Sequence, residues 1–277
     1  MQDKTAVKLS ISDKALIGMD PFDSLQQLSE HGFTHIHFSH KWQSADPLTG
    51  DELERLQRNL AASNLQVLDV HGMQLSIAAE DAQERQLAFD MFRRRLEITH
   101  ILSGDAMVCH VPEREFDDAV LARYIDGLQR LEDDVRNLGI IIALENHYKK
   151  ENDRRTLSAC FEKFDSSYIG FTFDPGHASI SGNLTWLLEN CMDRLTILHL
   201  NDNDGVQDKH WLPFQSEGVV DWEAVVQGIA KSPYRKPVQL EVFWRQDKHA
   251  SRPEFLDAAN KASQKLHNKI CDLRAVS

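Results

Sequence analysis

Long apolar stretches and dense cysteines are both missing from this chain of 277 residues. No run approaches the roughly 20 apolar residues of a membrane-spanning helix, so we expect a protein that does not enter a membrane. The first residues, MQDKTAVKLSIS, lack the basic segment and apolar core of a secretion signal. The four cysteines show no CxxC spacing, and a reducing, cytoplasmic setting is the simplest interpretation.

Positive charge is scarce as well. The chain carries 31 Lys and Arg residues against 43 Asp and Glu residues, which gives a formal net charge of -12. A negative field repels phosphate backbones at long range, and no basic run in the sequence offsets it. The composition therefore argues against a nucleic-acid partner.

The chain does contain a regular alternation of strand-like and helix-like segments. The strand-like runs are 7–12, 35–40, 65–72, 106–111, 139–147, 169–177, 195–202 and 238–243. The helix-like segments are 22–31, 51–63, 82–102, 117–138, 156–164, 184–191, 222–231 and 254–270, several with apolar residues three and four positions apart. Eight such units predict an α/β fold, a closed (β/α)8 TIM barrel.

One competing architecture is a doubly wound open sheet. Residues 140–144 are continuously apolar, which is typical of a parallel strand covered on both faces and fits either fold. The phosphate-binding fingerprint GxGxxG of the open sheet is absent, so the barrel ranks first. The sequence has no linker and no low-complexity segment, which predicts a single domain over residues 1–277.

Four of the strand-like runs end in a side chain of the kind that binds metals. GIIIALENH delivers Glu145, IGFTFDPGH delivers Asp174, LTILHLND delivers His199 and VQLEVF delivers Glu241. Functional groups of a TIM barrel gather at the carboxyl ends of its strands, so these tips should meet. Asp174 alone could start a turn before Pro175, but several carboxylates without a cation would repel one another. The set therefore predicts a divalent metal site.

Further histidines and a carboxylate lie at the same end of the predicted barrel. His71 and His110 follow the third and fourth strand-like runs, and His177 comes three residues after Asp174. Asp208 and His210 lie two residues apart after the seventh run, so in an extended segment they face the same side. A histidine near a strand end is more often structural than a ligand, so His71 or His110 alone would indicate little.

Five segments carry a specific resemblance. LENH (144–147), FDPGH (173–177), HLNDNDG (199–205), DKH (208–210) and SEGVVDW (216–222) resemble the xylose isomerase-like TIM-barrel superfamily. That superfamily includes sugar and sugar-phosphate isomerases, epimerases and the endonuclease IV type of abasic-site endonucleases. The likeness spans most of the chain and is strongest from residue 139 to residue 243.

The two branches of the superfamily imply different sites. The epimerase branch implies one divalent metal, held by the residues matching Glu145, Asp174, His199 and Glu241, with the histidine matching His177 touching the substrate. The endonuclease branch implies three zinc ions. The positions matching all of its ligands are filled here, with His71, His110, His177, Asp208 and His210 completing a second and a third metal site. Both ligand patterns are therefore satisfied.

Other features decide between the branches. An abasic-site endonuclease needs basic and wedge-shaped side chains to hold a bent duplex, whereas the loop GMQLS after His71 offers none. The family's GEG also reads SEG here, with Ser216 in place of the first glycine. The sequence therefore favours a divalent-metal-dependent sugar or sugar-phosphate isomerase or epimerase. A multinuclear zinc hydrolase or lyase of the abasic-site endonuclease type is the alternative, and a barrel that binds sugar without turnover ranks third.

The favoured mechanism is proton transfer through a metal-bound enediolate, which stabilises charge as a substrate C–H proton leaves. Glu145 and Glu241, on the fifth and eighth strands, are the predicted catalytic acid and base. The ligand types suit Mn²⁺, Zn²⁺, Co²⁺ or Fe²⁺, with one ion expected and up to three allowed. The sugar and its stereocentre stay open at this stage.

Substrate contacts are less sharply predicted. Trp42 and Trp211 would lie at the same end of the barrel, where flat rings stack on sugar surfaces, or they would cover the rim or form a homo-oligomer contact. Lys149, Arg245 and Arg114 also follow strand-like runs and could bind a phosphate or carboxylate of the substrate. A solvated basic loop is the alternative for each of them.

Overall fold

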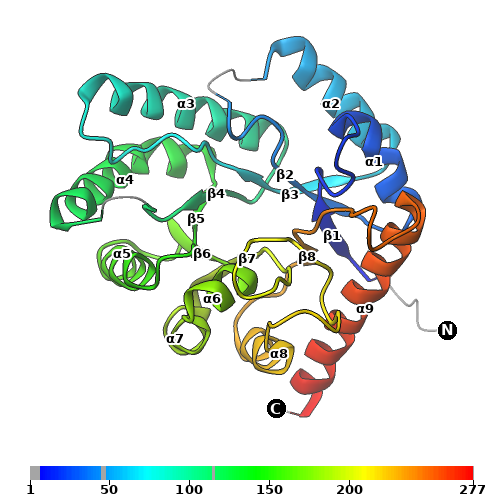
Figure 1. Ribbon diagram of the computed structural model, residues 1–277. Coiled ribbons are helices and arrows are strands. Elements are labelled where there is room, and N and C mark those ends of the chain that lie inside the picture. The colour runs from blue at the N-terminus through cyan, green and yellow to red at the C-terminus, as the bar shows by residue number, and fades with distance from the viewer. Residues whose placement is uncertain (1–6, 45–47, 114–115, 277) are drawn as a thin grey trace.

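Eight parallel strands form a TIM barrel in the computed structural model, which describes residues 7–44, 48–113 and 116–276 (Figure 1). Their order in the sheet is β7-β6-β5-β4-β3-β2-β1-β8. Their bounds are β1 Leu9–Ser12, β2 His35–Phe38, β3 Gln66–His71, β4 Ala106–His110, β5 Ile141–Glu145, β6 Ile169–Phe173, β7 Leu195–Leu198 and β8 Val238–Leu240. The predicted fold class is confirmed, and each strand lies inside its predicted run.

The barrel closes between the segment just after β7 and the last residue of β8. Leu200 pairs with Leu240 in a parallel bridge. The amide of Leu200 donates to the carbonyl of Gln239 at 3.2 Å, and the amide of Glu241 donates to the carbonyl of Leu200 at 3.1 Å. These bonds hold the segments that carry His199 and Glu241 side by side.

Helices surround the strands, as Figure 1 shows. Their bounds are α1 Pro21–Glu30, α2 Gly50–Ala62, α3 Ala82–Ile101, α4 Asp118–Leu138, α5 Lys150–Lys163, α6 Pro175–Ser181, α7 Leu184–Asn190, α8 Trp222–Lys231 and α9 Arg252–Val276, with a 3-10 turn η1 at Met192–Arg194. The helix α6 is missing from the sequence-based set, because Pro175 and Gly176 suggested only a turn. Pro occupies the first turn of α6, where a missing amide proton costs no helical hydrogen bond.

Side chains at the helix starts explain why several helices begin where they do. Thr49 and Glu52 form a reciprocal pair at the start of α2, each side chain accepting from the other's backbone amide. Three other helices, α1, α3 and α4, begin at a single carboxylate that accepts from backbone amides of the first turn: Asp20, Asp81 and Asp117 respectively. Each cap satisfies amides that the helix leaves without a partner, typically contributing about 1 kcal/mol.

The core has two layers because successive residues of a strand point to opposite faces. Along β4 and β5, Met107, Ile142 and Leu144 belong to the large cluster between the strands and the helices. Val108 and Ala143 belong to a small separate cluster inside the barrel, together with Leu68, Ala106 and Ile197. Glu145 has the same parity as Ala143, so the strand directs its carboxylate to the inside of the barrel.

None of the described helices combines the length and the apolar character that crossing a membrane would require.

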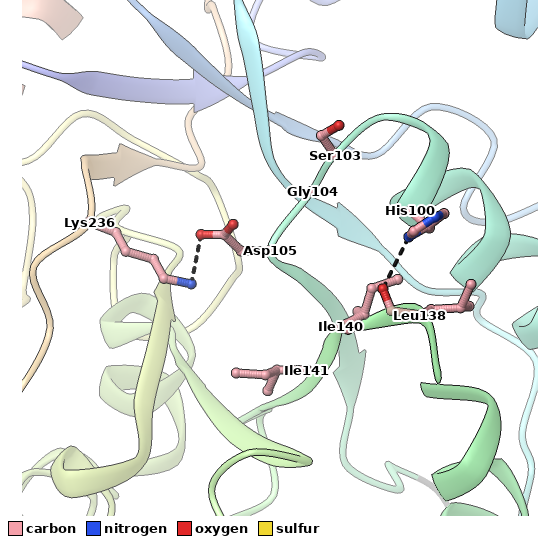
Figure 2. A pocket seen from close by; sticks show the side chains of 9 residues that line it. His100, Ser103, Gly104, Asp105, Leu138, Ile140, Ile141 and Lys236 are labelled. Carbon is pink, nitrogen blue, oxygen red and sulfur yellow. Dashed lines mark hydrogen bonds and ion pairs between the residues drawn. The ribbon is translucent and has the colours of Figure 1, made fainter. Parts of the chain in front are cut away.

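A hollow of about 460 Å³ lies at the amino ends of the strands, opposite the polar tips. Figure 2 shows Asp105, which precedes β4, paired with Lys236, which precedes β8, at 3.0 Å. His100 hydrogen-bonds the carbonyl of Leu138 at 3.0 Å beside it. This face of a TIM barrel serves stability rather than chemistry, so the hollow is separate from the candidate site.

Candidate metal centre

The four predicted metal ligands meet at the carboxyl ends of four neighbouring strands. Glu145 is the last residue of β5, and Asp174, His199 and Glu241 each directly follow β6, β7 and β8. One ligand atom from each lies within 4.8 Å of the others, and all four residues are buried. The closed barrel thus brings four residues that are far apart in the sequence into one compact group. We call this group the four-ligand centre.

His199 lies between the two glutamates. Its Nδ1 is 2.8 Å from Oε1 of Glu145 and 3.1 Å from Oε2 of Glu241. Burial by itself raises the pKa of both carboxyls, but the neighbouring histidines outweigh it and hold both pKa values below the usual range. Both glutamates are therefore carboxylates at neutral pH.

Asp174 differs from the two glutamates because its pKa is raised, to about 7, mainly by burial. The positive charge of His177 opposes this rise, and repulsion from the carboxylates of Glu145, Asp208 and Glu241 adds to it. Oε2 of Glu145 is buried without a hydrogen-bond partner within the described residues. Three carboxylates and one imidazole lie together here, and one of the carboxylate oxygens has no hydrogen-bond partner in the described part of the chain. Such a set of donors suits a divalent cation, which would remove the repulsion between the carboxylates. The residues present therefore fit a metal ion.

Asp174 also has a structural role. Its Oδ1 accepts from the amide of His177 at 2.8 Å and caps α6, while its Oδ2 accepts from Nδ2 of Asn201 at 2.7 Å. Gly176 allows this close packing, because a Cβ there would lie 2.1 Å from Oδ1 of Asn201. Asp174 therefore starts a helix rather than the turn considered for it, and this cap positions the carboxylate at the four-ligand centre.

A second group shares Glu145. Nε2 of His110 is 3.2 Å and Nε2 of His71 is 3.7 Å from Oε2 of Glu145. Burial alone would lower the pKa of His110, but the charge of Glu145 and the hydrogen bond that His110 donates to Glu113 raise it to about 9. These three residues also have ligand atoms within 4.8 Å of one another, so the sequence-predicted second set is brought together.

A third group consists of His177, Asp208 and His210. Oδ2 of Asp208 is 2.8 Å from Nε2 of His210 and 3.4 Å from Nε2 of His177. The hydroxyl of Tyr148 donates to the same oxygen at 2.9 Å. Burial would raise the pKa of Asp208, but the two histidines keep it low. The nine side chains implied by the endonuclease branch therefore lie in three adjoining groups.

Sequence reasoning missed His37 and Asp69, which lie beneath the four-ligand centre. Nδ1 of His37 is 2.5 Å from Oδ2 of Asp69, and the same oxygen is 3.6 Å from Nε2 of His199. A register shift between β2 and β3 pairs His37 with Asp69 directly, and such bulges commonly re-aim side chains beside functional sites. Asp69 is fully buried and places a carboxylate charge beside the far nitrogen of His199.

Glu113 and His147 were also missed. Oε1 of Glu113 is 3.0 Å from Nδ1 of His110 and 3.3 Å from Nε2 of His147. Burial and the charges of His110 and His177 lower the pKa of His147 to about 3, so its ring is neutral. The sequence signal was available for His147, since it belongs to the run LENH, but nothing marks Glu113 in the loop after β4.

The predicted substrate contacts are placed unevenly. The ring centroid of Trp42 lies 4.4 Å from that of His71 and 5.6 Å from that of His110.

Trp211 is buried, with the Arg245 guanidinium 5.3 Å from its ring centroid. Arg245 also pairs with Asp247, and Lys149 is exposed at the start of α5. Arg114 lies outside the described residues. Trp42 alone among these four described side chains touches the metal-type histidines.

The SEG loop is held by a buried carboxylate. Asp202 accepts hydrogen bonds from the amides of Val219 and Val220 and, at 2.7 Å, from the ring nitrogen of Trp222. A Cβ at Gly218 would lie 2.2 Å from Asp202 Oδ2, so this position requires glycine. Ser216 is exposed. The first position of the motif therefore tolerates a side chain, whereas its last position does not.

A buried acid outside these groups makes stability depend on pH. Asp153 accepts from the amide of His147 at 2.9 Å and from Asn183 at 3.4 Å. Burial, opposed by these hydrogen bonds, raises its pKa to about 7 from 3.8. The folded state thus prefers the protonated acid. Its contribution to stability is greatest below the unfolded pKa and falls as pH rises toward 7.

We expect Asp153→Asn to remove this pH dependence. Raising the pH from about 5 to about 8 should lower the unfolding free energy of the wild type by roughly 2 to 3 kcal/mol relative to the variant. Urea unfolding of both proteins at the two pH values measures the difference. A constant difference between wild type and variant would show that Asp153 is ionised at both pH values.

A model of the family described as xylose isomerase-like TIM barrel matches residues 25–265. The uncharacterized protein y4fM of Sinorhizobium fredii is 27% identical over 91% of this chain and 90% of its own length.

Two solved structures share the fold. A D-tagatose 3-epimerase-like protein superimposes with a TM-score of 0.74 at 19% identity, covering 98% of this chain and 99% of its own. The IolI protein, solved with a binding zinc atom, gives a TM-score of 0.70 at 18% identity with the same coverages.

Proposed function

The chain belongs to the xylose isomerase-like TIM-barrel family, and we propose that it is a divalent-metal-dependent isomerase or epimerase of a sugar or sugar phosphate. The observation that carries this proposal is the pairing of Glu145 and Glu241 across His199, at 2.8 and 3.1 Å from its Nδ1. The two carboxylates come from β5 and β8 and approach one small volume from different sides. A pair of that kind serves proton removal and return.

The chemistry follows from the charges at the four-ligand centre. A divalent cation held by Glu145, Asp174, His199 and Glu241 would stabilise negative charge on two adjacent substrate oxygens. One glutamate accepts the proton of the intervening C–H bond, and the electron pair of that bond moves into an enediolate. The other glutamate takes up a proton from solvent and passes it to the opposite face of the same carbon, or to the neighbouring carbon, while the first glutamate releases its proton to solvent. The first outcome is epimerisation and the second is isomerisation, and each conserves protons.

The surroundings suit this role. Glu145 is 1% exposed and Glu241 is 8% exposed, so little water competes for the transferred proton. Beside the centre, Asp69 accepts a hydrogen bond from His37 and Glu113 accepts one from His110, which fixes the orientation of these two rings. Trp42 offers an aromatic face beside His71 for a sugar ring.

The proposal includes the identity of the metal and the setting of the protein. Imidazole with carboxylates suits Mn²⁺, Co²⁺, Fe²⁺ or Zn²⁺, and zinc is the ion bound in the IolI structure. The substrate is a small molecule, and we infer a cytoplasmic protein with one domain over residues 1–277. The D-tagatose 3-epimerase-like neighbour supports a ketose substrate.

Solvent exchange tests the proposed function. The metal-loaded protein is incubated in D₂O with a panel of free ketoses, and deuterium at carbon is followed by NMR and mass spectrometry. We expect incorporation at the carbon next to the carbonyl in at least one ketose, and loss of incorporation after chelation. Metal-independent incorporation, or none with any ketose, would contradict the proposal.

A second function is favoured by the two further groups. The positions of the additional ligands in a trinuclear zinc hydrolase of the abasic-site endonuclease type are filled here by His71 and His110 in one group and by His177, Asp208 and His210 in the other. The net charge of -12 opposes a DNA substrate. Three tightly bound zinc ions per chain, together with cleavage of an abasic-site duplex, would select this alternative over the epimerase.

A further inference from the structure

A cavity of about 750 Å³ adjoins the metal-type histidines. It lies among the segments that follow β2, β3 and β4 and the helices α3 and α4. Trp42 and His110 line it, and His110 reaches Glu145 of the four-ligand centre at 3.2 Å. His110 therefore lies between the cavity and the four-ligand centre. Pockets of roughly 300 to 1,000 Å³ typically hold drug-sized ligands, so this one exceeds the needs of a single sugar ring.

Much of the cavity wall is apolar. Met73, Ile77 and Phe92 are buried side chains that line it, and Leu75 is partly buried. Leu87, on α3, is 46% exposed and faces the same cavity. The wall therefore suits a ligand with apolar faces, such as the C–H faces of a sugar ring.

The charged side chains of the wall are mainly acidic. Glu80, Glu84 and Glu113 line the cavity against a single guanidinium, Arg123. Nε of Arg123 donates to the carbonyl of Ala78 at 2.9 Å, which ties this cation to the loop before α3. The three carboxylates outnumber Arg123 and the His110 ring, the cationic side chains of this wall, so the local charge is negative and disfavours a phosphate group.

We propose that this cavity binds an uncharged substituent of the substrate, a second sugar ring or a comparable aglycone. The proposal rests on the proposed function and narrows its substrate class. The substrate is then a keto-sugar joined through a glycosidic oxygen to an uncharged group, and a free or phosphorylated monosaccharide is a poor substitute. The four-ligand centre holds the keto-sugar, and the substituent extends past His110 and Trp42 into the cavity.

Three ligands with one ketose in common test this inference. D-fructose, D-fructose 6-phosphate and isomaltulose differ in the substituent on O6, which is hydrogen, a phosphoryl group or a glucosyl ring. We expect calorimetry with the metal-loaded protein to give a Kd for isomaltulose about tenfold or more below those of the other two. Equal Kd values, tightest binding of the phosphate, or no binding of isomaltulose would each overturn the proposal.

A variant locates the effect in the cavity. Leu87→Trp narrows the wall at an exposed helix position, so we expect the Kd for isomaltulose to rise about tenfold while that for D-fructose changes less than about twofold. Ile101→Trp is the matched control, because Ile101 is 41% exposed on the same helix and lies outside the cavity wall. Its Kd values should equal those of the wild type. An unchanged Kd for isomaltulose in Leu87→Trp would place the glucosyl ring elsewhere.

Failure of this inference differs from failure of the proposed function. Deuterium exchange on free ketoses does not require the cavity. If the protein exchanges deuterium but binds isomaltulose no more tightly than D-fructose, only the assignment of the cavity is contradicted. Absence of metal-dependent exchange with every ketose, isomaltulose included, sinks the proposed function as well.

Discussion

Glu145→Gln and Glu241→Gln should each lower the rate of substrate C–H exchange by roughly 10³-fold or more at saturating metal. An amide keeps the shape of the side chain but does not accept the proton. The pKa of each carboxyl is held below its usual range by the neighbouring histidines, so both wild-type glutamates are ready bases at neutral pH. Deuterium incorporation into the ketose that the wild type exchanges measures the effect.

The control for these variants is Glu54→Gln. Glu54 is exposed on α2 and pairs with Arg58 at 3.5 Å, so its loss should leave exchange unchanged. Far-UV circular dichroism establishes that all three variants fold. Exchange at the wild-type rate in either Glu145→Gln or Glu241→Gln would show that another group moves the proton.

Asp69→Asn should weaken metal binding about 10- to 100-fold, although Asp69 is not among the four ligands. Its Oδ2 accepts from His37 at 2.5 Å and lies 3.6 Å from Nε2 of His199. The carboxylate charge favours a proton on the far nitrogen of His199, while Nδ1 faces Glu145 and Glu241. An amide in this place removes the charge and offers a donor toward the rings. Titration with Mn²⁺ measures the Kd.

Asp13→Asn separates this effect from the general cost of a buried amide. Asp13 is 1% exposed and accepts from Ser39 and from the amide of His40, without a contact to the four-ligand centre. Both variants should lose stability in urea, but only Asp69→Asn should bind Mn²⁺ more weakly. Equal Mn²⁺ affinity in Asp69→Asn and the wild type would reduce Asp69 to a packing role.

The strands and the four-ligand centre were predictable because each signal is local. A buried parallel strand is a short apolar run, and a polar residue at its end stands out, as Glu145 does after IIAL. Barrel topology then brings the ends together. Asp174 shows the limit of such signals, because DPG indicated a turn whereas the structure has the helix α6 there.

The sequence did not predict His37 and Asp69 as part of the site. They lie inside the runs HIHFSH and LQVLDV, where a polar residue between apolar ones usually indicates a solvent-facing strand position. Only barrel closure and the register shift beside His37 bring the two residues together under His199. The cavity along α3 was not predicted for a similar reason, since its wall combines separate loops with a helix face.

Metal content tests the central claim most directly. Protein purified without chelator and loaded with Mn²⁺ or Zn²⁺ is analysed for bound metal per chain, for the wild type and for His199→Ala. The four-ligand centre predicts one tightly bound divalent cation in the wild type, and its loss in His199→Ala with the circular dichroism spectrum retained. A wild type without a tightly bound cation, or His199→Ala with a full equivalent of metal, would contradict the account.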